Sequence, residues 1–307
     1  MTIGQILVTA FIEGSAFVFF TIAETAALPQ VVYRQQLPAA SAQNNAGYGL
    51  MELIGAPIAG FLYNAVGRLV PFIFDAVSYS ASVVSLTFIR TRFQIERAKT
   101  ARHLGAEIAE GMCWLWSRPL IRLLAILAAG VNFRMVATYL IVIVLAQNMG
   151  ANAFQLGLVF SVAAGAGIVG SIIGGIIQRR FSFVQVITVT RVLTTLIFPL
   201  YLFASNIFLL GLVTVALYIF DPIYDVVQYS YRLALIPDHL QGRVNSSFRL
   251  IAWGMRPISA ALTGILLEHG GPNITILVFA AIGLFFALPV FSPAVRNAPS
   301  VEHTPTN

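Results

Sequence analysis

The chain has 307 residues, of which 58% are hydrophobic and only 10% are charged. Its mean hydropathy of +0.84 excludes a water-soluble globular domain. The formal net charge of +6 would suit a nucleic-acid-binding protein. However, the positive residues fall in short segments between apolar stretches, as in membrane proteins, so nucleic acid is not an expected partner.

Nine apolar stretches follow one another along the chain, each near the roughly 20 residues that a membrane-spanning helix needs. They cover residues 3–28, 44–66, 71–89, 119–147, 154–177, 183–204, 206–231, 248–267 and 274–294. The sequence therefore predicts an all-α, polytopic membrane protein with about nine transmembrane helices, whose main solvent is the lipid bilayer.

The spacing of these stretches predicts four parts. We expect a partial N-terminal bundle of three spans (1–90), a cytoplasmic linker (91–117), a C-terminal six-helix bundle (118–295) and a cytoplasmic tail (296–307). Within the linker, apolar residues recur at helical spacing among charges and end at Trp114 and Trp116, which predicts an interfacial helix with an aromatic anchor. The recurring residues are Ile95, Ala98, Leu104, Ile108 and Met112.

The distribution of positive charge predicts the orientation. Threading the nine stretches as alternating spans puts fourteen of the 18 Lys and Arg residues on one side and only Arg68 on the other. The positive-inside rule makes the crowded side cytoplasmic, so the C-terminus is expected in the cytoplasm and the first span enters from outside. Because Glu13 interrupts that span and no cleavage site follows it, we expect neither a signal peptide nor a complete N-terminus.

Three segments carry a resemblance to a known family. They are LPQVVYRQQLPAASAQNNAGYGLMELIGAPIAGFLYNAVGRLVPFIFDAVSYSAS (28–82), AEIAEGMCWLWSRPLIRLL (106–124) and IPDHLQGRVNSSFRLIAWGMRPISAALTGILLE (236–268). They resemble the major facilitator superfamily, closest to the drug and siderophore exporters similar to macrolide-efflux and enterobactin-export proteins. The resemblance implies a chain that begins at the fourth of twelve helices, with substrate held near the bilayer midplane between two halves.

The resemblance implies a secondary active transporter in the plasma membrane. The expected activity is proton-coupled efflux of a bulky organic molecule, of drug or siderophore class, by alternating access, so a small-molecule substrate and protons are the expected partners. A truncated chain that is inactive or depends on a partner is the main alternative. A membrane-embedded enzyme is disfavoured because the sequence shows no phosphate-binding loop and no polar cluster at one interface.

Ionisable residues inside the spans are the candidate functional residues, because each costs roughly 2.5–3.5 kcal/mol at a helix centre unless it is paired or hydrated. Judged by depth, they fall into two sets within which we expect pairing. Asp225, Arg191 and Arg256 form the inner set. The set near the middle of the membrane consists of Glu13, Glu52, Arg134 and Asp221. Asp75 also lies within a span.

The family's layout would place helices four, seven and ten around the cavity. The candidate substrate or proton pathway then comprises Glu13, Arg134, Asp221, Tyr224, Asp225 and Gln228, with Asn132, Tyr139 and Tyr218 as further lining residues. The spacing of three, four and seven residues predicts that the four candidates from 221 to 228 share one helix face. Glu52, Asp75, Arg191 and Arg256 are expected to be structural or gating charges.

Two other features of the sequence argue against metal, cofactor or dinucleotide binding. The only cysteine is Cys113, and the four histidines are scattered, so neither a metal site nor a cofactor is expected. Gly165, Gly167 and Gly170 spell the dinucleotide-binding pattern, but they lie in the middle of a span. There we expect them, together with Gly174, to let neighbouring helices approach closely.

Overall fold

A computed structural model of the chain describes residues 3–31, 36–88, 104–237 and 240–298. All regular structure in these ranges is helical, which confirms the predicted all-α class. The main helices are α1 Ile3–Val31, α2 Leu37–Ala65, α3 Val70–Thr87, α4 Leu104–Ser117, α5 Pro119–Asn148, α6 Ala153–Ile177, α7 Phe183–Ile197, α8 Ile207–Leu235 and α9 Gln241–Ala287. Shorter helices are η2 Phe198–Phe203, η4 Leu288–Phe291 and α10 Pro293–Arg296.

The chain divides into two compact units. The first unit comprises Met1–Met51 and Leu69–Thr100, and the second comprises Glu52–Arg68 and Ala101–Asn307. In the first unit, α3 has no buried residue along its whole length. The second unit is a packed helical bundle and contains the residues discussed below.

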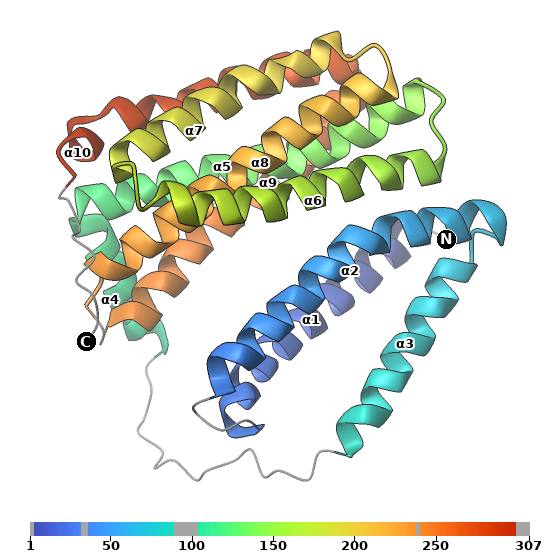
Figure 1. Ribbon diagram of the computed structural model, residues 1–307, viewed down its shortest axis with the longest axis horizontal. Coiled ribbons are helices and arrows are strands. Elements are labelled where there is room, and N and C mark those ends of the chain that lie inside the picture. The colour runs from blue at the N-terminus through green and yellow to red at the C-terminus, as the bar shows by residue number, and fades with distance from the viewer. Residues whose placement is uncertain (1–2, 32–35, 89–103, 238–239, 299–307) are drawn as a thin grey trace. The chain divides into compact units, whose positions relative to one another are not determined.

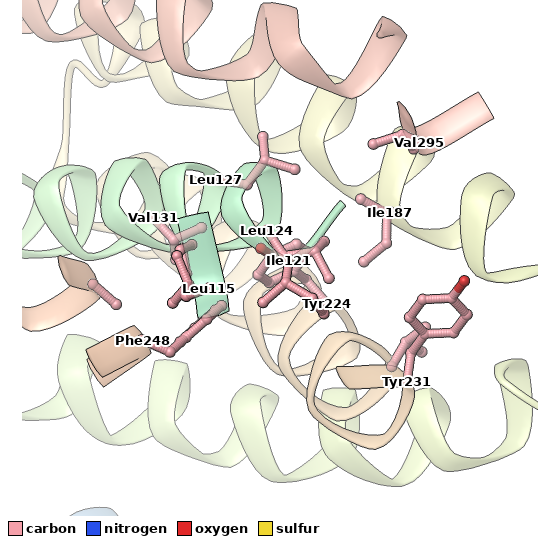
Figure 2. Close-up of a cluster of buried hydrophobic side chains, with 14 of the residues drawn as sticks. Leu115, Ile121, Leu124, Leu127, Val131, Ile187, Tyr224, Tyr231, Phe248 and Val295 are labelled. Carbon is pink, nitrogen blue, oxygen red and sulfur yellow. The ribbon is translucent and has the colours of Figure 1, made fainter. Parts of the chain in front are cut away.

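Helices of the second unit pack in pairs that are distant in sequence (Figure 1). α6 lies along α8, and α5 lies along α9. α7 also packs on α8, and α4 packs against α9. The bundle core is formed by these contacts, and one of its apolar clusters includes Leu124, Ile187 and Phe248, from α5, α7 and α9 (Figure 2).

Polar caps determine where three of the helices begin. Asn152 and Gln155 form a reciprocal capping box at the start of α6, and Ser182 and Gln185 form another at the start of α7. The side chain of Asn206 accepts from the backbone N–H of Leu209 at the start of α8. Such caps satisfy backbone donors that a helix terminus would otherwise leave free. They place these starts within one or two residues of the predicted spans.

Six helical segments of the described residues are long and apolar enough to cross a membrane. One of them, Gln241–Phe291, contains the predicted span 248–267 and most of the predicted span 274–294. Its helix α9 is broken at Gly271, whose φ of 70° and ψ of 178° are not helical, and Pro272 follows. Glycine adopts this positive φ without the strain that a side chain would cause, and proline favours a helix start, so a turn forms where the sequence predicts one.

Close approach of α6 and α8 confirms the expected role of the glycines. A Cβ added at Gly170 would collide with the backbone carbonyl of Ile219, and one at Gly174 would lie 3.1 Å from the Cα of Ile223. These residues therefore form a packing surface, because only a hydrogen at Cα leaves the two backbones enough room.

The predicted linker helix forms over Leu104–Ser117 as α4. α4 packs against the start of α9, where Gly111 lies against the backbone of Arg243, and Glu110 accepts a hydrogen bond from the Arg243 side chain. Leu115 is fully buried, whereas Trp116 is half exposed. The predicted residues Ile95 and Ala98 lie outside the described residues.

Candidate functional site

Three charged side chains from three helices meet inside the second unit. Nη2 of Arg134 on α5 donates to both carboxylate oxygens of Asp221 on α8, at 2.6 and 2.5 Å. Nη2 of Arg191 on α7 lies 3.4 Å from Oδ1 of the same carboxylate. All three side chains are buried: Arg134 is 6% exposed, Asp221 is 8% exposed and Arg191 is 5% exposed. We call this set the charge cluster.

The charge cluster carries two guanidinium groups for one carboxylate. The guanidinium of Arg191 also lies over the ring of Tyr224, 3.9 Å from its centre, where the ring's negative face attracts the cation. Nε of Arg191 is buried without a hydrogen-bond partner among the described residues. Removal of Asp221 would leave both cations without their counter-ion, and such a loss is strongly destabilising in a buried pair.

Cavities lie beside the charge cluster on two sides. Arg134 and Arg191 line a cavity of about 30 Å³ between α5, α7 and α9, which is close to the volume of one water molecule. Asp221 lines a larger hollow of about 220 Å³ formed by α5, α6 and α8. The polar residues of the hollow are Ser171, Tyr218, Asp221 and Asp225.

Asp221 and Asp225 therefore differ in environment although one helical turn separates them. Asp221 is buried and neutralised by two arginines. Asp225 is exposed toward the hollow and forms no salt bridge with any residue that the structure describes. The hollow thus has one carboxylate paired with two arginines and one without a salt bridge among the described residues.

The expected pairing of charges is only partly correct. Arg134 pairs with Asp221, as expected from their similar depth. Arg191 was assigned to the inner set with Asp225, but it contacts Asp221 instead. The prediction compared the depths of backbone positions only. The long side chain of Arg191 reaches a carboxylate one helical turn away from the one at its own depth.

Arg256 forms no salt bridge with Asp225 either. Its Nε donates to Oδ1 of Asn132 at 2.7 Å, and Asn132 in turn donates to the backbone carbonyl of Ala128 at 2.9 Å. A neutral amide on α5 therefore satisfies part of this guanidinium. Sequence depth could not reveal this, because Asn132 carries no charge.

The four polar residues expected on one face of α8 separate into two environments. Asp221 and Asp225 line the hollow. Tyr224 and Gln228 are 0% and 4% exposed, and Figure 2 shows Tyr224 within the apolar cluster that includes Leu124. Residues spaced by three and four positions cover a wide arc of a helix. The Tyr224 and Gln228 side of this arc therefore faces the core, while the Asp221 and Asp225 side faces the hollow.

The remaining candidates lie in other parts of the chain. Glu13 on α1 and Asp75 on α3 are exposed in the first unit. Glu52 lies within α2, and its side chain is outside the described residues. Tyr139 is half exposed on α5, with its ring centre 4.9 Å from that of Phe160.

One buried arginine was not among the predicted site residues. Arg232 is only 3% exposed, and its guanidinium lies 3.6 Å from the ring centre of Phe248. Its Nε and Nη1 have no hydrogen-bond partner among the described residues. Arg232 is one of the fourteen positive residues that the threading places on the cytoplasmic side. The helical spacing of Asp221, Asp225 and Gln228 continues to position 232, and this signal could have identified it.

Long apolar helices that enclose buried charges beside an open hollow are typical of membrane transport proteins. The model of the Major Facilitator Superfamily matches residues 1–258, and the chain belongs to this family. It is similar to the multidrug efflux pump Tap of Mycolicibacterium fortuitum, with 24% identity over 263 residues. The matched region covers 81% of this chain and 62% of that protein, so the chain spans less than two thirds of its relative.

Proposed function

We propose that this chain is a secondary active transporter that exports a bulky organic molecule in exchange for protons. The observation that carries the proposal is the pair of unequal carboxylates at the hollow. Asp225 has no salt bridge among the described residues, whereas Asp221 is bound by Arg134 and Arg191. Of two carboxylates at one cavity, the one without a salt bridge can hold a proton and a substrate alternately, while the other stays paired with arginine.

Asp225 is the proposed exchange group. A carboxylate beside a substrate cavity loses water when the cavity closes, and the neutral form is then favoured over the charged form. A bound substrate that contacts Asp225 would reverse this preference by favouring the charged form or by displacing the proton. Proton uptake and substrate binding at the same oxygen atoms would then exclude each other, which couples their movements.

The charge cluster is the proposed connection between α8 and the rest of the bundle. Asp221 accepts from α5 and α7, so any rotation of α8 must stretch or exchange these contacts. Buried ion pairs have steep distance dependence, and such a cluster favours discrete arrangements over gradual ones. The similarity to a multidrug efflux pump supports export of a drug-like molecule.

The test is transport by the purified chain in liposomes with a pH gradient. Fluorescent organic cations, anions and neutral dyes of similar size would be supplied as substrates. We expect Asp225→Asn to abolish pH-driven transport while exchange of labelled for unlabelled dye continues, because exchange needs no net proton movement. Glu268→Gln, at an exposed carboxylate outside the hollow, is the matched control and should transport normally.

Two outcomes would contradict the proposal. Equal loss of exchange and of pH-driven transport in Asp225→Asn would show that this residue does not couple protons to substrate. A well-folded chain that transports none of the dyes would favour the alternative of an inactive or partner-dependent transporter chain.

A further inference from the structure

Two arginines flank a tryptophan on one side of α9. Arg249, Trp253 and Arg256 are four and three residues apart, so they follow one another along the same helix face. The guanidinium of Arg249 lies 5.5 Å from the centre of the Trp253 ring, and that of Arg256 lies 5.0 Å from it. All three residues are exposed in the second unit, and we call them the α9 strip.

The α9 strip carries positive charge without a counter-ion. Neither arginine forms a salt bridge in the part of the chain that the structure describes. Arg256 uses its Nε to bind Asn132, and its two terminal amino groups make no hydrogen bond to a described residue. A fixed guanidinium with free donors is suited to bind the oxygen atoms of a carboxylate, sulfonate or phosphate.

The position of Trp253 favours a ligand that also has an apolar part. Its side chain is half exposed between the two guanidinium groups, and aromatic rings pack favourably against the edge or offset face of an indole. A small inorganic anion would leave this surface in contact with water or lipid. An organic anion with an aromatic ring would satisfy the arginines and cover the indole together.

The depth of the α9 strip favours a transported molecule over a lipid headgroup. Arg256 lies seven residues beyond Arg249, which is about 10 Å along a helix. Its partner Asn132 is adjacent to Val131, which lines the hollow. A headgroup would need only one end of the α9 strip, whereas the strip continues from Arg249 to Arg256, which is bound to Asn132 on α5.

We propose that Arg249, Trp253 and Arg256 bind an organic anion that carries an aromatic ring. This inference rests on the proposed transport function and adds a substrate class to it. The anionic group contacts the arginines, and the ring packs on Trp253. A hydrogen-bond donor elsewhere on the same molecule then replaces the proton at Asp225 when the molecule reaches the hollow.

Binding can be measured on the whole chain in nanodiscs of phosphatidylcholine. With Trp114→Phe and Trp116→Phe, the only tryptophan left of the three is Trp253. Naphthalene-1-sulfonate is the anionic probe, and 1-naphthylmethylammonium is a cation of similar size. We expect saturable quenching of Trp253 by the sulfonate and no saturable quenching by the ammonium compound.

Variants then test the arginines. Because a charge-assisted hydrogen bond contributes about 1.5–3 kcal/mol, Arg256→Gln should raise the dissociation constant of the sulfonate at least about tenfold. Arg249→Gln should act in the same direction, and Arg256→Lys should lie between, since it retains charge but loses the planar fork. Arg296→Gln is the control, at an exposed arginine outside the α9 strip, and should bind normally.

Three results would overturn the inference. They are equal quenching by anion and cation, unchanged affinity in Arg256→Gln and Arg249→Gln, and competitive displacement of the sulfonate by phosphatidylglycerol, which would assign the α9 strip to lipid headgroups. Asp225→Asn separates this inference from the proposed function, because it should stop pH-driven transport and leave sulfonate binding intact. Normal pH-driven transport by Asp225→Asn would contradict the proposed function alone, and loss of sulfonate binding in Arg296→Gln as well as in Arg256→Gln would contradict this inference alone.

Discussion

Asp221 is the residue whose loss should destabilise the bundle most. Asp221→Asn leaves Arg134 and Arg191 buried without their counter-ion, and removing one partner of a buried ion pair costs roughly 3–5 kcal/mol. We expect a clear fall in the unfolding temperature of the purified chain, followed by tryptophan fluorescence in detergent. Asp75→Asn, at an exposed carboxylate of the first unit, should have little effect.

A double-mutant cycle tests the geometry of the charge cluster. Contacting charges usually couple by 0.5–3 kcal/mol in such cycles, so about that range is expected here. The coupling of Arg134 with Asp221 should exceed that of Arg191, because the shortest N–O distances are 2.5 and 3.4 Å. Equal couplings, or a stronger one for Arg191, would be inconsistent with the described arrangement.

Single residues were only partly predictable from the sequence. Because burying charge in a membrane is costly, the sequence predicted that Arg134, Asp221 and Asp225 line one pathway, and the structure brings them together around the hollow. It could not pair Arg191 with Asp221 or Arg256 with Asn132, because partners depend on side-chain reach and on uncharged groups. Their roles in transport remain predictions for the experiments above.

Gly170 controls how closely α6 approaches α8. Gly170→Ala would bring a methyl group against the carbonyl of Ile219, and backbone cannot move aside as a flexible side chain can. Overpacking of this kind typically costs about 1–3 kcal/mol. Gly175→Ala, five residues further on, meets nothing within 4 Å and should be neutral or slightly stabilising. Thermal unfolding of the two variants checks the difference in sign.

Two kinds of contact hold α4 on α9, and they should differ in strength. Gly111→Ala would place a Cβ 2.5 Å from the backbone oxygen of Arg243, so α4 must shift. Arg243→Gln removes exposed ion pairs with Glu107 and Glu110, which contribute at most about 1 kcal/mol. Hydrogen exchange of the α4 amides should therefore accelerate more in Gly111→Ala.

Gly105→Ala is the matched control for α4, since nothing lies within 4 Å of its added methyl group. It should leave hydrogen exchange of the helix unchanged. Faster exchange in Arg243→Gln than in Gly111→Ala would show that the ion pairs dominate the docking of α4.

The helices themselves were largely predictable. Apolar length placed the starts of α6 and α7 within one residue of where Asn152 and Ser182 cap these helices. The interfacial position of the linker stays a prediction, and the structure adds that α4 packs on α9. Its spacing of apolar residues shows only that one face avoids water, and both lipid and protein can cover such a face.

Across the whole molecule, the distribution of loop charges predicts the membrane orientation. In a Cys113→Ser background, a cysteine at Ser205 should react with an impermeant maleimide added to intact cells. A cysteine at Gly242 should react only after the membrane is opened. Both positions are exposed turns or helix ends. Reaction at Gly242 alone in intact cells would reverse the proposed topology.

By itself, the sequence determined the all-α class, the existence and limits of most helices, and which polar residues must avoid lipid. These properties depend on local composition and on the cost of placing charge or free backbone groups in a membrane. The pairing of α5 with α9 and of α6 with α8, the meeting of Arg134 and Arg191 at Asp221, and the hollow at Asp225 were decided only by tertiary structure. Such contacts join residues far apart in the chain, and side-chain reach and helix packing select them among many patterns that the same hydrophobic sequence permits.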